Sequence, residues 1–276
     1  MTMFFDKIES NNKRKKLHTE TYGNGDDPIV FLAGLGGTTR YWLPGIKSLG
    51  KNHSVTLIDL LGFGESPKPW VRYNVERHVS ALNDVLPKTG PITLVGHSLG
   101  ALLAVAYAAR YPSQIKKLIL ISLPYFGSKD KAVEYFKERN VRGGFLYTNA
   151  ILTIATCILT RRVFGKILPF IIRDLPRDIV KDLVKHTWCS STSSLWEVVY
   201  RHDASVDFRS LPKQLEVLFI HGEDDLSAPI SAVRSIAASR PNWNLFSLDG
   251  VDHHPFIRET EKCLALIDAS QSNSLA

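Results

Sequence analysis

Residues 92–112, ITLVGHSLGALLAVAYAARYP, contain the pattern that decides the fold. The apolar run 92–95 predicts a buried strand, and the Ala- and Leu-rich run 101–110 predicts a helix that Pro112 ends. Ser98, flanked by glycines, lies in the tight turn between them. A Gly-x-Ser-x-Gly sequence also occurs by chance in ordinary loops, but a strand before it and a helix after it favour a nucleophilic serine.

The geometry of this turn explains its glycines. Such a turn forces the residue at its tip into a sparsely populated backbone conformation, at a cost of about 1–3 kcal/mol. Gly96 and Gly100 have no Cβ, so the strand and the helix can approach each other closely. The Ser98 hydroxyl is then held at the carboxyl end of the strand and at a helix N-terminus, where free N–H groups favour developing negative charge.

Strand patterns and helical patterns alternate along most of the chain. Because helical patterns lie between the strands, the sequence predicts an α/β fold with a mostly parallel, twisted sheet. Ligands of such sheets bind at the carboxyl ends of the strands, which is where Ser98 lies. The predicted strands are residues 17–22 at an edge, and then 29–33, 55–59, 92–95, 117–122, 215–220 and 244–248.

The alternation breaks between residues 125 and 207. Strand-like runs are missing there, and helical patterns occur at 131–138, 150–159, 163–172, 179–186 and 194–200. We therefore predict a first core part (1–124), a helical cap or lid inserted over the sheet (125–207) and a second core part (208–276). The apolar residues of the insertion fit two roles, packing against the core and forming a wall for an apolar substrate.

Composition narrows the class of protein. The 276 residues are 44% hydrophobic and 22% charged, as in ordinary globular domains, and the net charge is +7. We find no nucleic-acid-binding motif and expect no nucleic-acid partner, since basic runs such as 13–16 are typical of solvated faces. The three cysteines show neither metal-binding nor disulfide spacing, and the N-terminus has no signal-peptide core, so we expect a cytoplasmic protein. The apolar run 145–160 is too short and too polar for a membrane span.

A serine hydroxyl becomes a good nucleophile only beside a base that a third group orients. Asp225 and His253 each follow a predicted late strand, so both lie at the sheet edge that carries Ser98. We interpret Ser98 as the nucleophile, His253 as the base and Asp225 as the acid that orients it. The neighbouring residues that could take the last two roles instead are His254, Glu223 and Asp224.

Four motifs together resemble those of the α/β-hydrolase superfamily, in its single-domain form with a helical cap. The chain order Ser98, Asp225, His253 is that of the family's triad, and the family's His-x-Pro pattern favours His253 over His254. The resemblance implies an eight-stranded, mostly parallel, twisted sheet with helices on both faces. The motifs are the Gly-x-Ser-x-Gly turn at 96–100, a glycine loop at 34–38, a D-x-x-G-x-G-x-S loop at 59–66 and a G-x-x-D motif at 222–225.

The same resemblance implies roles for residues around Ser98. The backbone N–H groups of Leu35 and Leu99 would form the oxyanion hole. One departure is Ala33, where the family often has a structural histidine, but backbone donors tolerate a side-chain change. The residues implied at the substrate pocket are Gly34, Gly36, Trp42 and His97.

These residues predict a serine hydrolase that cleaves a carboxylic ester with an apolar acyl or alcohol group. Ser98 attacks the carbonyl, His253 takes its proton, Asp225 orients His253, and water then cleaves the acyl-enzyme. Because Ser98 stands where related dehalogenases and epoxide hydrolases have Asp, those activities are excluded. The expected partner is a small-molecule substrate, an apolar ester, and the mechanism implies no metal and no organic cofactor.

Other functions fit the same sequence. Carbon–carbon bond hydrolysis and acyl transfer to an alcohol use the same triad, and a non-catalytic small-molecule binding protein can retain it. The basic, apolar insertion also fits contact with an anionic membrane surface. The sequence sets neither the substrate nor the oligomeric state.

Overall fold

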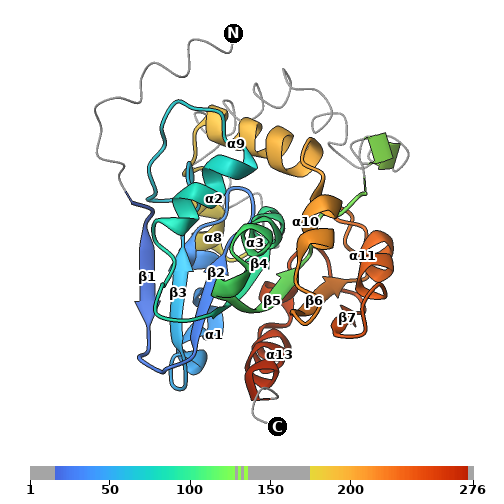
Figure 1. The fold of residues 1–276 in the computed structure, drawn as a ribbon. Coiled ribbons are helices and arrows are strands. Elements are labelled where there is room, and N and C mark those ends of the chain that lie inside the picture. The colour runs from blue at the N-terminus through green and yellow to red at the C-terminus, as the bar shows by residue number, and fades with distance from the viewer. Residues whose placement is uncertain (1–15, 128–129, 132–133, 136–174, 273–276) are drawn as a thin grey trace.

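Seven strands in the described part of the chain form one sheet at the centre of the molecule (Figure 1). The structure is a computed structural model that describes residues 16–127, 130–131, 134–135 and 175–272. The strands lie in the order β1-β3-β2-β4-β5-β6-β7; β1 is antiparallel to β3, and the other neighbours are parallel. They are β1 (Thr19–Tyr22), β2 (Pro28–Leu32), β3 (Ser54–Ile58), β4 (Ile92–His97), β5 (Ile115–Ile121), β6 (Glu216–Gly222) and β7 (Trp243–Leu248).

The mostly parallel sheet expected from the sequence is confirmed, with one correction. The resemblance implied eight strands, but the described residues form seven, because residues 16–27 supply a single strand, β1, to that edge. The middle strand of the seven is β4. The turn that carries Ser98 therefore follows the most enclosed strand of the sheet.

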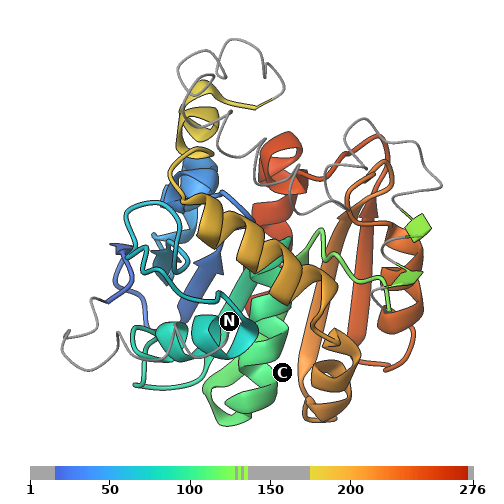
Figure 2. The same cartoon turned by 90° about the horizontal axis from the view of Figure 1, so that it is seen from above.

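Helices cover both faces of the sheet (Figures 1 and 2). Alternate residues of β2 show this, since Val30 and Leu32 belong to one buried cluster and Ile29 and Phe31 to the other. Burial on both faces explains why the strand sequences are almost continuously apolar. The first cluster includes side chains from α2 (Val75–Asn83), α3 (Leu99–Arg110), α10 (Ala204–Ser210) and α11 (Ile230–Ala237), and the second from α1 (Leu43–Leu49), α12 (Pro255–Arg258) and α13 (Thr260–Ser272).

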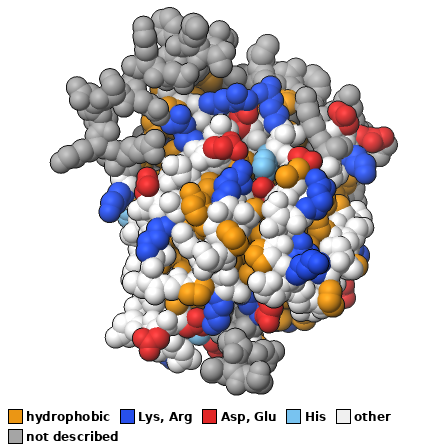
Figure 3. All heavy atoms as spheres, viewed as in Figure 1, with side chains coloured by type: hydrophobic (Ala, Val, Ile, Leu, Met, Phe, Trp, Pro, Cys, Tyr) orange, Lys and Arg blue, Asp and Glu red, His pale blue; other side chains and the backbone are white. Residues whose placement is uncertain are grey.

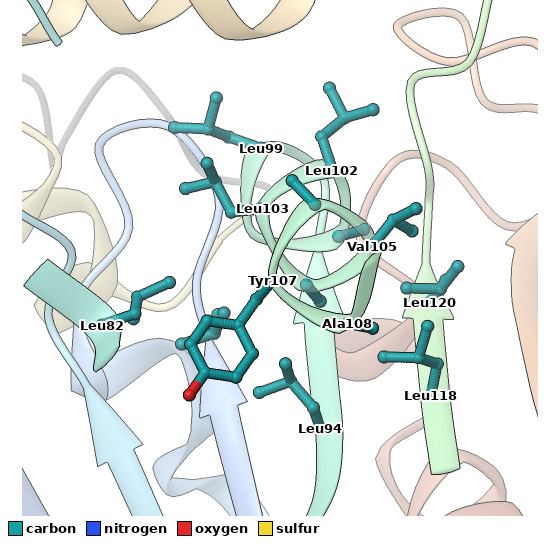
Figure 4. Close-up of a cluster of buried hydrophobic side chains, with 14 of the residues drawn as sticks. Leu82, Leu94, Leu99, Leu102, Leu103, Val105, Tyr107, Ala108, Leu118 and Leu120 are labelled. Atoms are coloured by element: carbon teal, nitrogen blue, oxygen red, sulfur yellow. The ribbon is translucent and has the colours of Figure 1, made fainter. Parts of the chain in front are cut away.

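The helix that follows Ser98 is itself enclosed. Every residue of α3 from Leu99 to Ala108 is buried, and Figure 4 shows Leu82, Leu94 and Leu118 packed around it. A helix that is apolar on every face has to be buried on every face. The burial of α3 therefore accounts for its Ala- and Leu-rich sequence. The turn between β4 and α3 is thus fixed by packing at both of its ends.

Between β5 and β6 the structure describes α8 (Arg177–Asp182), α9 (Trp188–Ser194) and the π-helical η6 (Leu195–Tyr200). The sequence predicted helices at 179–186 and 194–200. The second begins earlier than expected because Thr187 and Ser190 form a capping box that starts α9. The expected helices 150–159 and 163–172 lie outside the described residues, as does most of 131–138, so a cap formed by 125–207 stays a prediction.

Two short 3-10 turns, η3 (Thr39–Trp42) and η4 (Pro112–Gln114), complete the described elements. On the face viewed in Figure 3, basic side chains lie among acidic and apolar ones. None of the helices in the described ranges combines the length and the apolar composition needed to cross a bilayer.

Candidate active site

Ser98 stands at the tip of a strained turn between β4 and α3. Its φ is +52° and its ψ is −118°, and its backbone N–H donates to the Ile121 carbonyl at 2.9 Å. A Cβ at position 96 would lie 2.4 Å from the carbonyl oxygen of Gly100, and a Cβ at position 100 would lie 2.3 Å from that of Leu32. The two glycines are therefore required by close backbone approach, as the sequence predicted.

Ser98, His253 and Asp225 form a continuous hydrogen-bonded chain. His253 Nε2 is 2.9 Å from Ser98 Oγ, and His253 Nδ1 is 2.7 Å from Asp225 Oδ2. Because an ionised carboxylate can only accept, Nδ1 carries the proton and Nε2 accepts from the serine hydroxyl. The three residues that sequence reasoning placed at one sheet edge are thus in contact, at the carboxyl ends of β4, β6 and β7.

Asp225 is buried, 2% exposed, and is held ionised by its partners. Its Oδ1 accepts from the backbone N–H groups of Ser227 (2.8 Å) and Ala228 (2.9 Å), and its Oδ2 faces His253 and His221. Burial alone would raise the pKa of Asp225, but the hydrogen bonds from His221 and His253 outweigh it and hold this pKa well below its ordinary value. The carboxylate can therefore stabilise a positive charge on His253.

His221 is a partner of the acid that the sequence interpretation did not find. The structure places it fully buried, with Nε2 2.6 Å from the Ala228 carbonyl and 3.4 Å from Asp225 Oδ2. The available signal was its position four residues before Asp225, near the end of β6, the strand that leads into the Asp225 loop. Glu223, an alternative acid, instead pairs with Arg234 at the surface.

His97 supports the base rather than lining the pocket, which corrects its expected role. Its side chain is 3% exposed, its Nε2 donates to the His253 carbonyl at 2.8 Å, and its ring stacks on Tyr41 at 4.6 Å. Burial, together with the nearby rings of His253 and His254, lowers the pKa of His97 well below its ordinary value. A neutral His97 is thus the donor to the backbone of the base.

The two adjacent histidines make different contacts. His253 reaches Ser98, whereas His254 Nδ1 lies 3.5 Å from the Tyr41 hydroxyl. Burial, and then the charge of His253, lowers the pKa of His254 to about 4. His254 is therefore a neutral side chain that packs beside the base and makes no contact with the serine.

The segment of residues 34–38, here called the glycine loop, runs beside Ser98. A Cβ at Gly34 would lie 3.1 Å from Ser98 Cβ, and Gly36 adopts a φ of +76°. Leu35 lies in the turn that the Gly37 N–H closes onto the Gly34 carbonyl at 3.0 Å. Leu99 is the first residue of α3, and an N–H in the first turn of a helix has no intrahelical acceptor.

Trp42 does not line the pocket, contrary to expectation. It is fully buried, and its ring centroid lies 5.0 Å from that of Phe31 and 4.8 Å from that of Phe256. Trp42 therefore belongs to the core beneath the site. It is the last residue of η3, which begins immediately after the glycine loop.

The D-x-x-G-x-G-x-S loop, residues 59–66, hydrogen-bonds to the backbone that follows the glycine loop. Asp59 is buried and accepts from the backbone N–H groups of Thr39 (2.7 Å) and Glu65 (2.8 Å). A Cβ at Gly64 would lie 2.0 Å from Asp59 Oδ2, so only glycine fits there. Ser66 Oγ donates to the Asp59 carbonyl at 2.6 Å. This motif thus holds the backbone of Thr39, next to the glycine loop, and does not itself reach Ser98.

The acidic and histidine side chains of the site interact with one another, since Asp225 contacts both His253 and His221. In the described residues, His, Cys, Asp and Glu side chains do not gather in groups of three or more that could hold a metal ion. What the arrangement offers chemically is a serine hydroxyl with a base and an ionised acid behind it, and backbone amides beside it.

Known proteins share this fold. Residues 27–149 match the family model described as "alpha/beta hydrolase fold". A "Probable lysophospholipase BODYGUARD 5" of Arabidopsis thaliana is 24% identical over 271 residues, which cover 86% of this chain and 60% of that protein. The "Biotin biosynthesis bifunctional protein BioHC" of Teredinibacter turnerae is 26% identical over 255 residues, which cover 87% and 44%. The chain thus spans less than two thirds of the length of either relative.

Solved structures resemble the whole chain. An esterase from Thermogutta terrifontis has a TM-score of 0.72 at 19% identity and covers 93% of each chain. MenH from S. aureus has a TM-score of 0.73 at 20% identity, over 94% of this chain and 99% of that one. An enol-lactonase from Burkholderia xenovorans has a TM-score of 0.69 at 22% identity, over 93% and 96%. At these identities the likeness establishes the fold.

Proposed function

Because this chain is an α/β-hydrolase-fold protein, we propose that it is a serine hydrolase that cleaves carboxylic esters with an apolar acyl or alcohol group. One observation carries the proposal, the hydrogen-bonded chain from Ser98 Oγ through His253 to Asp225, at 2.9 and 2.7 Å. These distances are within the reach that proton transfer between a nucleophile and its base requires. The strained φ of Ser98 supports it, since such backbone strain is concentrated at functional sites.

The residues act in a fixed order in this proposal. Ser98 Oγ attacks the ester carbonyl while His253 Nε2 takes the serine proton, and Asp225 stabilises the resulting imidazolium. The backbone N–H groups of Leu35 and Leu99 hold the oxyanion of the tetrahedral intermediate. His253 returns the proton to the leaving alcohol. A water molecule, deprotonated by His253, then attacks the acyl-enzyme, and His253 gives this proton to Ser98 Oγ as the acid is released.

The substrate class has two supports. The similar proteins named above include an esterase, an enol-lactonase and a probable lysophospholipase, and all three names denote cleavage of an ester bond. The sequence between residues 125 and 207 is rich in apolar residues, which suits a wall for an apolar substrate group. A helical cap over the site remains part of this proposal.

The test is a series of p-nitrophenyl esters, from acetate to palmitate, on the wild type and on Ser98→Ala. We expect turnover that peaks at one chain length and falls by about 10³-fold or more in Ser98→Ala. The control is Ser122→Ala, because Ser122 is the other described non-glycine residue with a positive φ, at 48°, and its buried hydroxyl has no hydrogen-bond partner in the described residues. Equal turnover in wild type and Ser98→Ala would refute the proposal.

A wild type that cleaves none of these esters would redirect the assignment. Products from carbon–carbon substrates, or acyl transfer when an alcohol is added, would point to another reaction on the same triad. A tightly bound small molecule that stays unchanged over hours would point to a binding protein.

A further inference from the structure

The glycine loop is held from outside by the short helix α8. The Thr38 hydroxyl donates a 2.9 Å hydrogen bond to Oδ2 of Asp182, the last residue of α8. Both residues are 4% exposed, although 144 positions separate them in the sequence. A buried carboxylate is costly to desolvate, so its placement against one buried hydroxyl is a specific feature of this fold.

Two cations compensate the buried charge of Asp182. Arg40 Nε lies 3.3 Å from Oδ2, and Lys185 Nζ lies 3.1 Å from Oδ1 and 2.9 Å from Glu65 Oε1. The hydrogen bond to Glu65, with that to Asp182, raises the pKa of Lys185 against the effect of burial. Both cations are partly exposed, at 46% for Arg40 and 36% for Lys185, so water can solvate them if Asp182 is removed.

The loop that α8 holds has little rigidity of its own. Three of its five residues are glycines, and Gly36 adopts a positive φ. At Gly34 the loop faces Ser98, whereas at Gly36 a Cβ would lie 3.4 Å from the Leu183 carbonyl oxygen. The loop is therefore enclosed between the serine and the chain that follows α8, and its position depends on the contacts at its ends.

We propose that Asp182 is a positioning residue, which fixes the glycine loop by holding Thr38. This inference rests on the proposed function, because its consequence is the placement of the Leu35 N–H that receives the oxyanion. Complete loss of one such donor lowers the rate by about 10²–10³-fold. A donor that is displaced but still present loses part of this effect, so we expect removal of the anchor to lower kcat by about 10–100-fold.

The contact can be removed from either side. Asp182→Ala deletes the acceptor, and Thr38→Val deletes the donor while it keeps the side-chain shape. Thr38→Val also removes the hydrogen bond that Thr38 Oγ1 accepts from the Arg40 N–H at 3.3 Å. We therefore expect Thr38→Val to lower kcat by at least the factor seen in Asp182→Ala, and both to leave KM within about threefold. The double variant should be no worse than Thr38→Val, because the Thr38–Asp182 contact is already lost there. Thr38→Ser keeps the hydroxyl and should retain most of the wild-type kcat.

The matched control is Asp178→Ala. Asp178 lies on the same helix, but it is exposed and forms an ion pair with Lys181, at 3.0 Å. It should leave kcat unchanged. Thermal unfolding of each variant separates a folded protein with a displaced loop from one that has lost its fold. If Asp182→Ala is unfolded, Thr38→Val and Thr38→Ser decide the question, since only Thr38→Ser keeps the hydroxyl.

A second readout does not need the natural substrate. The rate at which a fluorophosphonate labels Ser98 should fall in Thr38→Val and Asp182→Ala in parallel with kcat. Folded variants with kcat and labelling rates within twofold of wild type would overturn the role of Asp182 while the proposed function stands. Equal ester turnover in Ser98→Ala would instead overturn the proposed function and this inference with it.

Discussion

His97 connects the turn that carries Ser98 to the backbone of His253. It directly precedes Ser98 in sequence, and its Nε2 donates to the His253 carbonyl at 2.8 Å. Its ring is buried and stacked on Tyr41, so it has little freedom to move. Ser98 and His253, which exchange a proton in the proposed mechanism, are thus linked by a second route besides their own 2.9 Å contact.

Replacing His97 should therefore lower kcat more than it raises KM. In His97→Phe the ring remains but the donor is lost, and we expect a fall of about 10–100-fold because small misplacements of a catalytic group are costly. His97→Gln can still present an N–H to the His253 carbonyl and should lose less. The control is His78→Gln, because His78, on α2, is buried and its Nε2 lies 3.0 Å from Ser194 Oγ rather than near the triad. Equal kcat values in His97→Phe and wild type would contradict this role.

The β4–turn–α3 element owes its shape to two glycines that act on different neighbours. Gly96 faces the first turn of α3, whereas Gly100 faces the backbone of β2 and the residue after it. A Cβ at Gly100 would lie 2.3 Å from the Leu32 carbonyl oxygen and 2.6 Å from that of Ala33. Neither oxygen belongs to a flexible side chain, so the helix would have to move away from the sheet.

Gly100→Ala should thus destabilise the protein by about 1–3 kcal/mol, the range typical of an overpacked core. It should also lower activity, because any shift of α3 moves Ser98 and the Leu99 amide together. Urea unfolding and ester turnover measure the two effects. Gly90→Ala is the matched control, since a Cβ at Gly90 would meet nothing within 4 Å. A Gly100→Ala protein as stable as Gly90→Ala would show that the close approach is not required.

The same element shows what the sequence could predict. Its determinants are local: an apolar strand, two glycines around a serine, and an apolar helix follow one another within 20 residues, so pattern alone places Ser98 correctly. The contacts of His97 and Trp42 are not local. His97 meets a residue 156 positions away, and Trp42 packs against Phe256, so side-chain patterns near them could not distinguish pocket from core.

The order of the strands decides how much of the site is visible from the sequence. Ser98, Asp225 and His253 follow β4, β6 and β7, and parallel strands bring their carboxyl ends to one edge. The residues could therefore be grouped without a structure. Asp182 was missed because a buried carboxylate on α8 has no sequence pattern of its own, and the spacing of His221 four residues before Asp225 does not by itself show a contact. Only tertiary packing gives them Thr38 and Asp225 as partners.

Buried neutral histidines give the whole molecule a dependence on pH. Burial lowers the pKa of His78 to about 3, and burial with nearby charge lowers that of His254 to about 4 and that of His97 well below its ordinary value. In the unfolded chain each has a pKa of about 6.5. Below that pH these histidines are protonated in the unfolded chain but still neutral in the folded protein, so acidification favours unfolding.

The free energy of unfolding should fall by about 1.4 kcal/mol per histidine between pH 7.5 and 5.5, or about 4 kcal/mol for the three. Asp225 does not contribute in this window, because its lowered pKa keeps it ionised in the folded state and its share of stability is lost only at much lower pH. Urea unfolding at the two pH values measures the fall. His78→Gln should reduce it by about 1.4 kcal/mol, and His78→Asn by the same amount, since neither side chain titrates. A fall that stays unchanged in both variants would mean that His78 binds its proton equally in the folded and unfolded states, and that burial in α2 does not exclude the charge.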